Sequence, residues 1–370
     1  MERYEAVRVL GRGSFATVIL AKLAEKEGGL LRVIKEVDLT RADEKRRNEA
    51  LYEVELLKSF SHPNIIAYHE AHLANARLCI VMEFADAGDL AAAVVARRAA
   101  NRRYHEREAM AIFVQLAMAL QYIHEKLILH RDLKSQNVFL TQAGVVKLGD
   151  FGIAKVLEAA DSMAETRIGT PYYLSPEMCE NKPYDFRADI WGLGVVLYEV
   201  LALEIPFSAP DIPSLVMKIC SSEPRPVSQA YSSDLRTLLK NMLAKRSDDR
   251  PSCAEIVALP HVRRGIAMLL KPEMPRSRCS SGLSVPTDTN PDDCGSVATT
   301  ILSVEPTSDP MIKPASYIDL DVASLSLPEE VGEQPQIQVN NSVGSLKHAL
   351  ESSMACEQLL RELEQEFNLA

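Results

Sequence analysis

Four polar residues near the middle of the chain have types and a spacing that could support catalysis. Three of them lie in the run His130-Arg-Asp132-Leu-Lys134-Ser-Gln-Asn137, and Asp150-Phe-Gly152 begins thirteen residues after Asn137. The Asp132 carboxylate can accept the proton of an attacking hydroxyl, and the Lys134 ammonium can neutralise charge on a moving phosphoryl group. The side-chain oxygens of Asn137 and Asp150 are hard ligands of the kind that Mg²⁺ prefers, with Mn²⁺ as an alternative ion. The spacing predicts phosphoryl transfer to a hydroxyl group.

A glycine-rich turn near the N-terminus could hold phosphate groups. Residues 4–12 and 16–23 are predicted strands, and the turn that joins them reads Gly11-Arg12-Gly13-Ser14-Phe15-Ala16, followed shortly by Val18. Glycine lets backbone amides approach a phosphate without a clashing Cβ. Because glycine pairs mark ordinary hairpin turns at least as often, the turn gains a functional meaning only from the motifs that follow it.

A lysine and a glutamate further along the chain could form an ion pair beside those phosphates. Lys35 ends a predicted strand, and Glu53 lies in a helix predicted over about 41–60. An inward pair would hold the Lys35 ammonium against the α- and β-phosphates of a nucleotide. Each residue alone would more often be solvated. The motifs of residues 130–152 make the ion pair the favoured interpretation.

Together these motifs resemble the protein kinase superfamily over about residues 1–262. The family order is complete, from the glycine turn through Val33-Ile-Lys35 and the two central motifs to Ser175-Pro-Glu177. The resemblance implies an α+β fold with two lobes, a small β-rich N-lobe of five strands and one helix over about 1–84 and a larger helical C-lobe over about 85–265. It also implies ATP as the phosphoryl donor. Three residues depart from the family pattern: Ala16 replaces the third glycine of the turn, Val33 replaces an alanine, and Ser175 replaces the alanine of the family's Ala-Pro-Glu motif.

The resemblance also implies roles for individual residues. The implied catalytic residues are Lys35, Glu53, Asp132, Lys134, Asn137 and Thr170, and the implied metal ligands are Asn137 and Asp150. The implied nucleotide site comprises Gly11, Arg12, Gly13, Ser14, Phe15, Ala16, Val18, Val33, Lys35, Met82, Glu83, Ala85, Asp89 and Phe139. Within it, Met82 is the gatekeeper and Glu83–Ala85 is the hinge. Asp189 is expected to brace the catalytic residues, and Arg250 is expected to pair with Glu177.

Several strings are similar to a narrower group, the NIMA-related serine/threonine kinases. These strings are HRDLKSQNVFLT, VKLGDFGIAKVLE and IGTPYYLSPE. Lys134 and the run Gly169-Thr170-Pro171 also imply a Ser/Thr rather than a Tyr acceptor, with Thr170 bridging Asp132 and Lys134. Members of the group often carry C-terminal coiled coils and act at centrosomes, basal bodies and cilia. The resemblance implies protein substrates. It also implies a location in the cytoplasm, with the centrosome, the basal body, the cytoskeleton or the nucleus as more specific places.

A catalytically inactive scaffold is the main alternative to an active enzyme. Pseudokinases usually lose at least one residue of the catalytic set. This chain retains all five of the residues on which turnover depends most, Lys35, Glu53, Asp132, Asn137 and Asp150. The sequence therefore favours an active serine/threonine kinase.

A regulatory phosphorylation site is predicted between residues 150 and 177. Arg131 is expected to be buried beside the catalytic Asp132 and to lack a partner until an anion arrives, and Lys155 could converge on the same point. A phosphate on Thr166 would satisfy both cations through charge-assisted hydrogen bonds. Ser162 is the competing site, and an unmodified loop hydroxyl at Thr166 is the remaining alternative.

The C-terminal part of the chain differs in composition from the rest. Residues 271–370 hold 16 acidic and 6 basic residues, so they account for the whole net charge of −10. Nine prolines lie within 272–335, among many Ser and Thr residues. Such a segment cannot bury enough apolar surface to offset the entropy of ordering. We predict a kinase domain over 1–265, a disordered acidic linker over 266–345 and an amphipathic helix over 346–370.

The predicted C-terminal helix carries an apolar seam. Its residues follow one another at alternating spacings of three and four: Leu346, Ala349, Ser353, Cys356, Leu360, Leu363 and Phe367. This pattern is typical of a short coiled coil, which would form a homodimer through 346–367. Because an isolated helix of this length is marginal in water, a frayed tail helix is an equally open alternative.

The overall composition restricts the partners and the compartment. No apolar run is long enough to span a membrane, and the first ten residues lack the basic and apolar regions of a signal peptide. The seven cysteines are scattered without a CxxC pair, which predicts reduced thiols in the cytoplasm or nucleus. An acidic tail on a neutral body argues against nucleic acid as the main partner.

Overall fold

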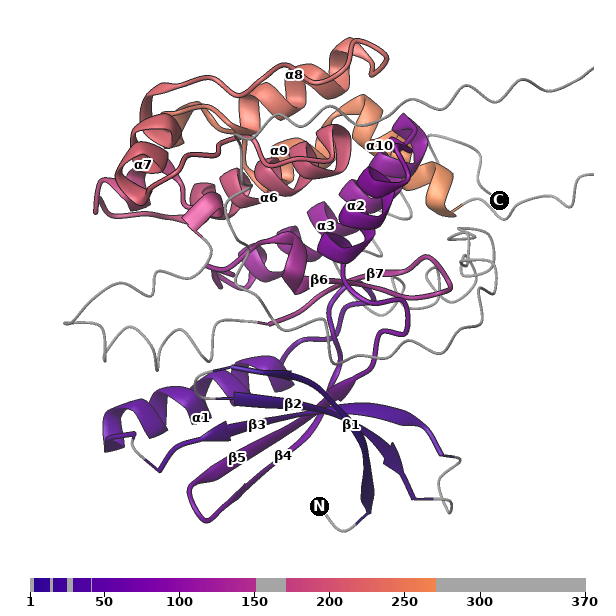
Figure 1. The fold of residues 1–370 in the computed structure, drawn as a ribbon, viewed down its shortest axis with the longest axis vertical. Coiled ribbons are helices and arrows are strands. Elements are labelled where there is room, and N and C mark those ends of the chain that lie inside the picture. The colour runs from indigo at the N-terminus through magenta and orange to yellow at the C-terminus, as the bar shows by residue number, and fades with distance from the viewer. Residues whose placement is uncertain (1–2, 14–15, 25–28, 41, 151–170, 271–370) are drawn as a thin grey trace, which may run out of the picture. The chain divides into compact units, whose positions relative to one another are not determined.

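The computed structural model describes residues 3–13, 16–24, 29–40, 42–150 and 171–270 (Figure 1). The side chains of Lys45, Arg46, Glu49 and Glu53 are not among the described parts. The predicted linker beyond residue 270 and the predicted C-terminal helix therefore lie outside the described residues.

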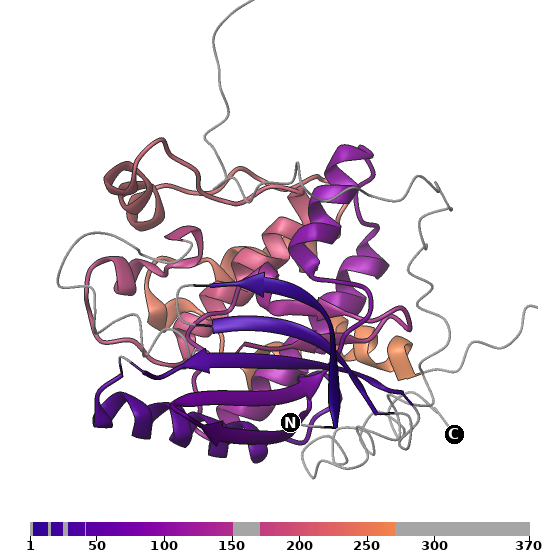
Figure 2. The ribbon, with the colours of Figure 1, turned by 60° about the horizontal axis from the view of Figure 1, so that its bottom comes forward.

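The N-terminal lobe is an antiparallel sheet with one helix. Its strands lie in the order β1-β2-β3-β5-β4, and α1 packs near β4 (Figure 1, Figure 2). The elements are β1 (Tyr4–Arg12), β2 (Ala16–Leu23), β3 (Leu31–Asp38), α1 (Glu44–Lys58), β4 (Tyr68–Ala74) and β5 (Arg77–Glu83). The first two strands have the predicted bounds, and α1 is somewhat shorter than the predicted 41–60.

Alternation along β3 directs its side chains to two different environments. Ile34 packs with Ala21 and Val81 in a small apolar cluster, whereas Val37 joins the main core. Successive residues of a strand point to opposite faces, so Lys35 lies on the same face as Val37. The strand thus places the lysine on the core side of the sheet, where it is only 7% exposed.

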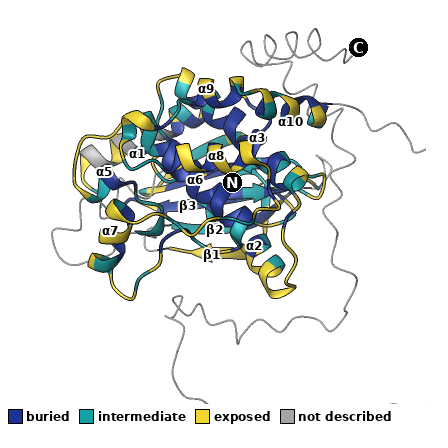
Figure 3. Ribbon diagram, turned by 90° about the horizontal axis from the view of Figure 1, so that it is seen from above, coloured by how far each residue is buried: buried dark blue, intermediate teal, exposed yellow. Residues whose placement is uncertain are grey.

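The C-terminal lobe is built from helices around α6 (Phe186–Ala202). This helix is apolar on all sides and its residues from Asp189 to Leu201 are buried, as expected for a helix at the centre of a lobe (Figure 3). The surrounding helices are α2 (Leu90–Ala99), α3 (Glu106–Glu125), α5 (Pro176–Cys179), α7 (Ile212–Ser221), α8 (Ser233–Met242), α9 (Cys253–Ala258) and α10 (Pro260–Leu270).

A short hairpin, β6 (Val138–Leu140) and β7 (Val146–Leu148), separates the two predicted catalytic motifs. The α+β fold with a sheet lobe and a helical lobe agrees with the prediction. Helix α10 continues five residues past the predicted domain end at 265 because Ile266, Ala267 and Leu270 are buried against the core. Within the described ranges, no helix is long and apolar enough to cross a membrane.

Candidate active site

Helix α6 holds the catalytic loop, residues 130–137, in place through Asp189. The carboxylate of Asp189 accepts hydrogen bonds from the backbone N–H groups of His130 and Arg131, both at 2.9 Å, and lies 2.9 Å from His124 Nε2. The backbone of Arg131 has φ of 65°, a left-handed conformation that such fixed contacts can maintain. Asp189 therefore braces this catalytic loop, as the sequence predicts.

Helix α6 approaches the catalytic loop closely because it carries a glycine at the contact. A Cβ on Gly192 would lie 3.1 Å from Leu133 Cβ and 3.2 Å from Leu133 O. The glycine lets Leu133, the neighbour of Asp132, pack directly against the helix.

Three predicted catalytic side chains meet within the loop. Lys134 Nζ lies 2.9 Å from Asp132 Oδ2. Asn137 Nδ2 donates to the backbone oxygen of Asp132 at 2.8 Å and to its Oδ2 at 3.1 Å. These contacts hold the Asp132 carboxylate in one orientation. They use the Nδ2 group of Asn137, so its side-chain oxygen is the atom that the predicted role as a metal ligand requires.

Lys35 and Asp150 bring the two lobes together at the site. Lys35 Nζ donates to Asp150 Oδ1, and the side chains are 9% and 44% exposed. Asp150 has φ of 57°, a second left-handed residue at the site. The predicted Lys35–Glu53 pair involves a side chain that the structure does not describe, although the Glu53 backbone lies in α1. That pair stays a prediction.

The predicted adenine-side residues share one face of the sheet. Val33 is the cross-strand partner of Met82, and Lys35 is that of Val18. Because Val33 and Lys35 are two positions apart on β3 and cross-strand partners share a face, the four side chains lie on the same side. Phe139 is on β6 and Ala85 is buried just after β5.

The glycine turn closes between β1 and β2. Gly13 N–H donates to Ala16 O at 2.7 Å, and Gly11, Arg12 and Gly13 are exposed. The remaining predicted turn residues, Ser14 and Phe15, lie outside the described residues.

Two predicted nucleotide-site residues have protein partners for their side chains. Glu83 lies 2.8 Å from Lys147 Nζ and accepts the Ala67 N–H at 3.0 Å. Asp89 caps α2 by accepting the Ala92 N–H at 2.8 Å. The Glu83–Lys147 pair was not predicted; it joins the end of β5 to β7 and so braces the hinge.

Sequence reasoning also missed a buried polar cluster beside the catalytic loop. Tyr173 donates to Glu199 Oε2, and its hydroxyl lies 2.9 Å from Ser135 Oγ. Burial raises the pKa of both Glu199 and Tyr173. The cluster joins the short 3-10 turn Pro171–Tyr173 to the loop and to α6. A lone glutamate inside the apolar run of α6 was the signal that could have found it.

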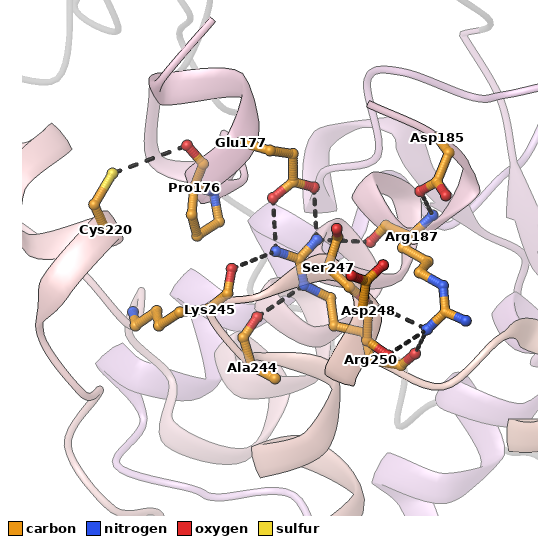
Figure 4. A network of polar contacts seen from close by, with 10 residues as sticks. All are labelled: Pro176, Glu177, Asp185, Arg187, Cys220, Ala244, Lys245, Ser247, Asp248 and Arg250. Atoms are coloured by element: carbon orange, nitrogen blue, oxygen red, sulfur yellow. Dashed lines mark hydrogen bonds and ion pairs between the residues drawn. The ribbon is translucent and has the colours of Figure 1, made fainter. Parts of the chain in front are cut away.

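The predicted pair Glu177–Arg250 is present and buried (Figure 4). Arg250 Nη1 and Nη2 lie 2.7 Å from the two Glu177 oxygens, and the arginine side chain is 0% exposed. Its remaining N–H groups donate to backbone oxygens of Ala244, Lys245 and Arg187. Burial alone would raise the pKa of Glu177, but the charge and hydrogen bonds of Arg250 outweigh it and lower that pKa.

The protein kinase domain family model matches residues 4–262. The chain belongs to the protein kinase family. Curated relatives of this kinase include a "Probable serine/threonine-protein kinase nek3" from Dictyostelium discoideum, 44% identical over 74% of this chain and 24% of the relative. "Serine/threonine-protein kinase Nek1" from Mus musculus is 44% identical over 74% of this chain and 22% of the relative. "Serine/threonine-protein kinase Nek4" from Mus musculus is 43% identical over 72% of this chain and 34% of the relative.

These comparisons confirm the predicted resemblance to the NIMA-related kinases. The matched region spans between about a fifth and about a third of the length of those three relatives. The similarity therefore concerns the kinase domain.

One expectation about the kinase's regulatory region is wrong. Arg131 was expected to be buried, but it is exposed, because the catalytic loop rests on α6 through backbone contacts and turns this side chain outward. The other predicted regulatory and activation-segment residues lie outside the described residues: Lys155, Ser162, Thr166 and Thr170.

The residues that the structure describes fit a Mg²⁺ ion of the kind that kinases use. They contain no cluster of three or more His, Cys, Asp or Glu side chains suited to a metal. Mg²⁺ needs no such cluster, because it keeps several waters and is bound by one or two carboxylates together with substrate phosphates. For such an ion, the predicted ligands Asp150 and Asn137 would provide one carboxylate and one amide oxygen.

Replacing Gly149 with alanine is expected to damage the predicted nucleotide site. An added Cβ would lie 2.9 Å from both Ile66 Cγ1 and Phe139 Cε2, so Phe139 must move. We expect a loss of about 1–3 kcal/mol in the free energy of unfolding, measured in urea, and severalfold weaker ATP binding, measured by calorimetry. Gly11→Ala is the stability control, since no atom lies within 4 Å of its added Cβ. Unchanged stability in Gly149→Ala would contradict the packing described for this residue.

Proposed function

We propose that this kinase transfers the γ-phosphate of ATP to Ser and Thr hydroxyl groups of protein substrates. The observation that carries the proposal is the arrangement around Asp132, which Lys134 and Asn137 hold in place. Lys35 and Asp150 contact each other at the site, where they would bind the nucleotide phosphates and the metal respectively. The curated relatives, all named serine/threonine kinases, support the same reading.

Each residue then has one task in the reaction. Asp132 accepts the proton of the substrate hydroxyl, and Lys134 balances charge on the phosphoryl group. Lys35 binds the α- and β-phosphates, while Asn137 and Asp150 hold the metal. Mg²⁺, or Mn²⁺ in its place, neutralises charge on the phosphate oxygens when bound.

A positional peptide library tests this proposal. Libraries with Ser, Thr or Tyr as the only acceptor are incubated with ATP and Mg²⁺, and label on Ser and Thr libraries is expected. Label on the Tyr library alone would contradict the acceptor class. No label on any library, with intact nucleotide binding, would favour the pseudokinase scaffold that the complete catalytic set argues against.

We also propose that phosphorylation of Thr166 activates the enzyme. The Arg131 side chain is exposed, so a phosphate on the segment 150–177 can reach its guanidinium group from solvent. A phosphate adds about −1.5 to −2 charge and three acceptor oxygens. Charge-assisted bonds to Arg131 and Lys155 would order the segment 150–177 and place Thr170 beside Lys134.

Thr166→Ala is therefore expected to lower turnover at least tenfold, about 1.4 kcal/mol on the barrier, with ATP affinity little changed. Arg131→Ala should cost a similar amount, and the double variant should cost no more than either, because both remove one contact. Ser162→Ala is the matched control. Full activity in Thr166→Ala together with a loss in Ser162→Ala would move the switch to Ser162.

The C-terminal segment 346–367 is proposed to form a homodimer through its apolar seam. Light scattering after gel filtration is expected to give twice the chain mass for the full chain. Leu360→Glu should give the single mass, since a charge in the seam opposes association. Glu357→Gln, off the seam, is the control. A single mass for the full chain would leave the frayed helix as the correct alternative.

The cellular location is proposed from the resemblance alone. We propose a cytoplasmic kinase that is concentrated at centrosomes, basal bodies or the cytoskeleton. The nucleus is the alternative location. Imaging of the tagged chain beside a centrosomal marker tests this, and a uniform distribution would contradict the concentrated location.

A further inference from the structure

Three exposed arginines gather where α2 ends and the chain turns toward α3: Arg98, Arg102 and Arg103. Within the ranges that the structure describes, none of these three side chains forms a hydrogen bond or an ion pair. We refer to the three residues as the arginine surface.

The turn that carries the arginine surface is held firmly by its neighbours. Arg97 Nη2 lies 2.7 Å from Glu108 Oε1, and the Arg97 guanidinium lies 4.1 Å from the centroid of the Tyr104 ring. Tyr104 is only 3% exposed, and its backbone oxygen accepts the Tyr231 hydroxyl at 2.8 Å. The backbone beneath the arginine surface is therefore fixed, although the three guanidinium groups reach into solvent.

The carboxylates nearest in sequence are engaged by other groups. Glu108 binds Arg97 and accepts the His105 N–H at 2.8 Å. Glu106 accepts hydrogen bonds from the backbone N–H and the hydroxyl of Ser232, both at 2.6 Å. Neither carboxylate pairs with the arginine surface, which keeps its positive charge.

Helix dipoles account for only one of the three charges. Arg98 lies in the last turn of α2, where a positive side chain is favourable. Arg102 and Arg103 come after the end of α2 at Ala99 and shortly before α3 begins at Glu106. A positive charge beside the N-terminus of a helix is unfavourable, so the dipoles do not explain these two arginines.

Helix α2 connects the arginine surface to the catalytic loop. Just before the helix, the Ala87 N–H donates to Leu140 O at 2.9 Å, and Asp89 forms a β-bridge with Phe139. These β6 residues follow closely after Asn137, the end of the catalytic loop. Helix α2 has 10 residues and is therefore about 15 Å long, with the arginine surface at its far end. An extended peptide covers that distance with about five residues at roughly 3.3 Å each.

We propose that the arginine surface docks an acidic segment of the protein substrate, at least about five residues away from the acceptor Ser or Thr. This inference rests on the proposed kinase function and names its substrate class, proteins with a run of Asp or Glu at that distance. Carboxylates suit this surface because arginine binds them through charge-assisted, often bidentate hydrogen bonds. Nucleic acid suits it less, since the net charge of −10 on the whole chain repels a long polyanion.

Two peptide substrates test the proposal with the full chain, ATP and Mg²⁺. Both have the same Ser acceptor and the same neighbouring residues; one carries a run of Asp about six residues from the acceptor, and the other carries Asn there. Versions with the run on either side of the acceptor cover both directions of the peptide. The acidic peptide is expected to have an about tenfold lower KM with kcat unchanged. The preference should disappear in about 1 M salt, which screens charges more than about 3 Å apart.

Replacing all three arginines with serine should raise the KM of the acidic peptide to that of the neutral peptide. Both constants of the neutral peptide should stay the same. The control variant loses the same number of charges from exposed residues of the N-terminal sheet, Arg8, Lys22 and Arg77, and should keep the preference. A second variant, with Arg102→Glu and Arg103→Glu, should lower the KM of a peptide that carries Lys in the run. A merely structural role of the turn would not produce that exchange of preference.

Peptide binding is also measured by fluorescence anisotropy, which needs no turnover. Binding of the acidic peptide without its phosphorylation would contradict the proposed kinase function and support the docking surface. Equal KM values for the two peptides, or a preference that survives in the triple serine variant, would overturn the docking surface alone. Faster turnover of both peptides in that variant would also overturn it, because acidic residues of the chain itself would then be the occupant. Tighter binding of a single-stranded oligonucleotide than of the acidic peptide would overturn it in favour of nucleic acid.

Discussion

Asp150→Asn is expected to lower phosphoryl transfer about 10³-fold while leaving the fold intact. The carboxylate of Asp150 pairs with Lys35 and is the only carboxylate among the predicted metal ligands. Asparagine keeps the volume but removes the charge, so the metal and the lysine both lose their partner. Loss of one such charge-stabilising group typically lowers turnover about 10²–10³-fold, and the loss of a metal ligand should place this variant at the upper end.

The fold should survive because the Asp150 side chain is 44% exposed. Thermal unfolding of the variant is expected within a few degrees of the wild-type midpoint. Asp248→Asn is the matched control, since this side chain is 82% exposed and far from the catalytic loop in sequence. Turnover by Asp150→Asn comparable to that of the wild type would contradict the assigned role.

Arg250→Met is expected to destabilise the helical lobe by about 3–5 kcal/mol, because it leaves the buried Glu177 charge without its partner. Arg250 is enclosed completely and makes two hydrogen bonds to the carboxylate. Methionine fills much of the volume, so the cost is mainly electrostatic. Urea unfolding measures it, and Arg246→Met, at a position where the side chain is 76% exposed, is the control, with an expected change below about 0.5 kcal/mol.

The effect of Arg250→Met should depend on pH. Because folding lowers the pKa of Glu177 from its ordinary 4.5, its contribution is fully present above pH 4.5 and is lost as the pH falls through the lower folded value. The difference between wild type and variant should therefore shrink in acid. The double variant with Glu177→Gln should lose less than the sum of the single losses. A difference that grows in acid, or strictly additive losses, would contradict the ion pair.

The sequence was sufficient wherever local patterns or spacing decide the structure. The glycine turn marked where β1 ends and β2 begins, and the resemblance implied the pair Glu177–Arg250. The predicted domain end at 265 falls short of the end of α10 at Leu270, because the last turn of this helix is stabilised by apolar contacts that composition alone does not reveal.

Contacts between distant segments could not be predicted where no motif of the family resemblance marks them. The Glu83–Lys147 pair joins residues 64 apart, and the Tyr173–Glu199–Ser135 cluster joins three separate elements. The spacing of residues along a helix or strand gives no information about such long-range contacts. The exposure of Arg131 has the same origin, since it depends on how the loop backbone rests on Asp189.

The most direct test of the proposed activity is phosphoamino-acid analysis of a protein substrate after incubation with γ-labelled ATP, Mg²⁺ and the purified chain. We expect label on phosphoserine and phosphothreonine, and its loss in Asp132→Asn, since that variant removes the proton acceptor that Lys134 and Asn137 hold. Label on phosphotyrosine alone, or equal label with Asp132→Asn, would contradict a serine/threonine kinase that works through this site.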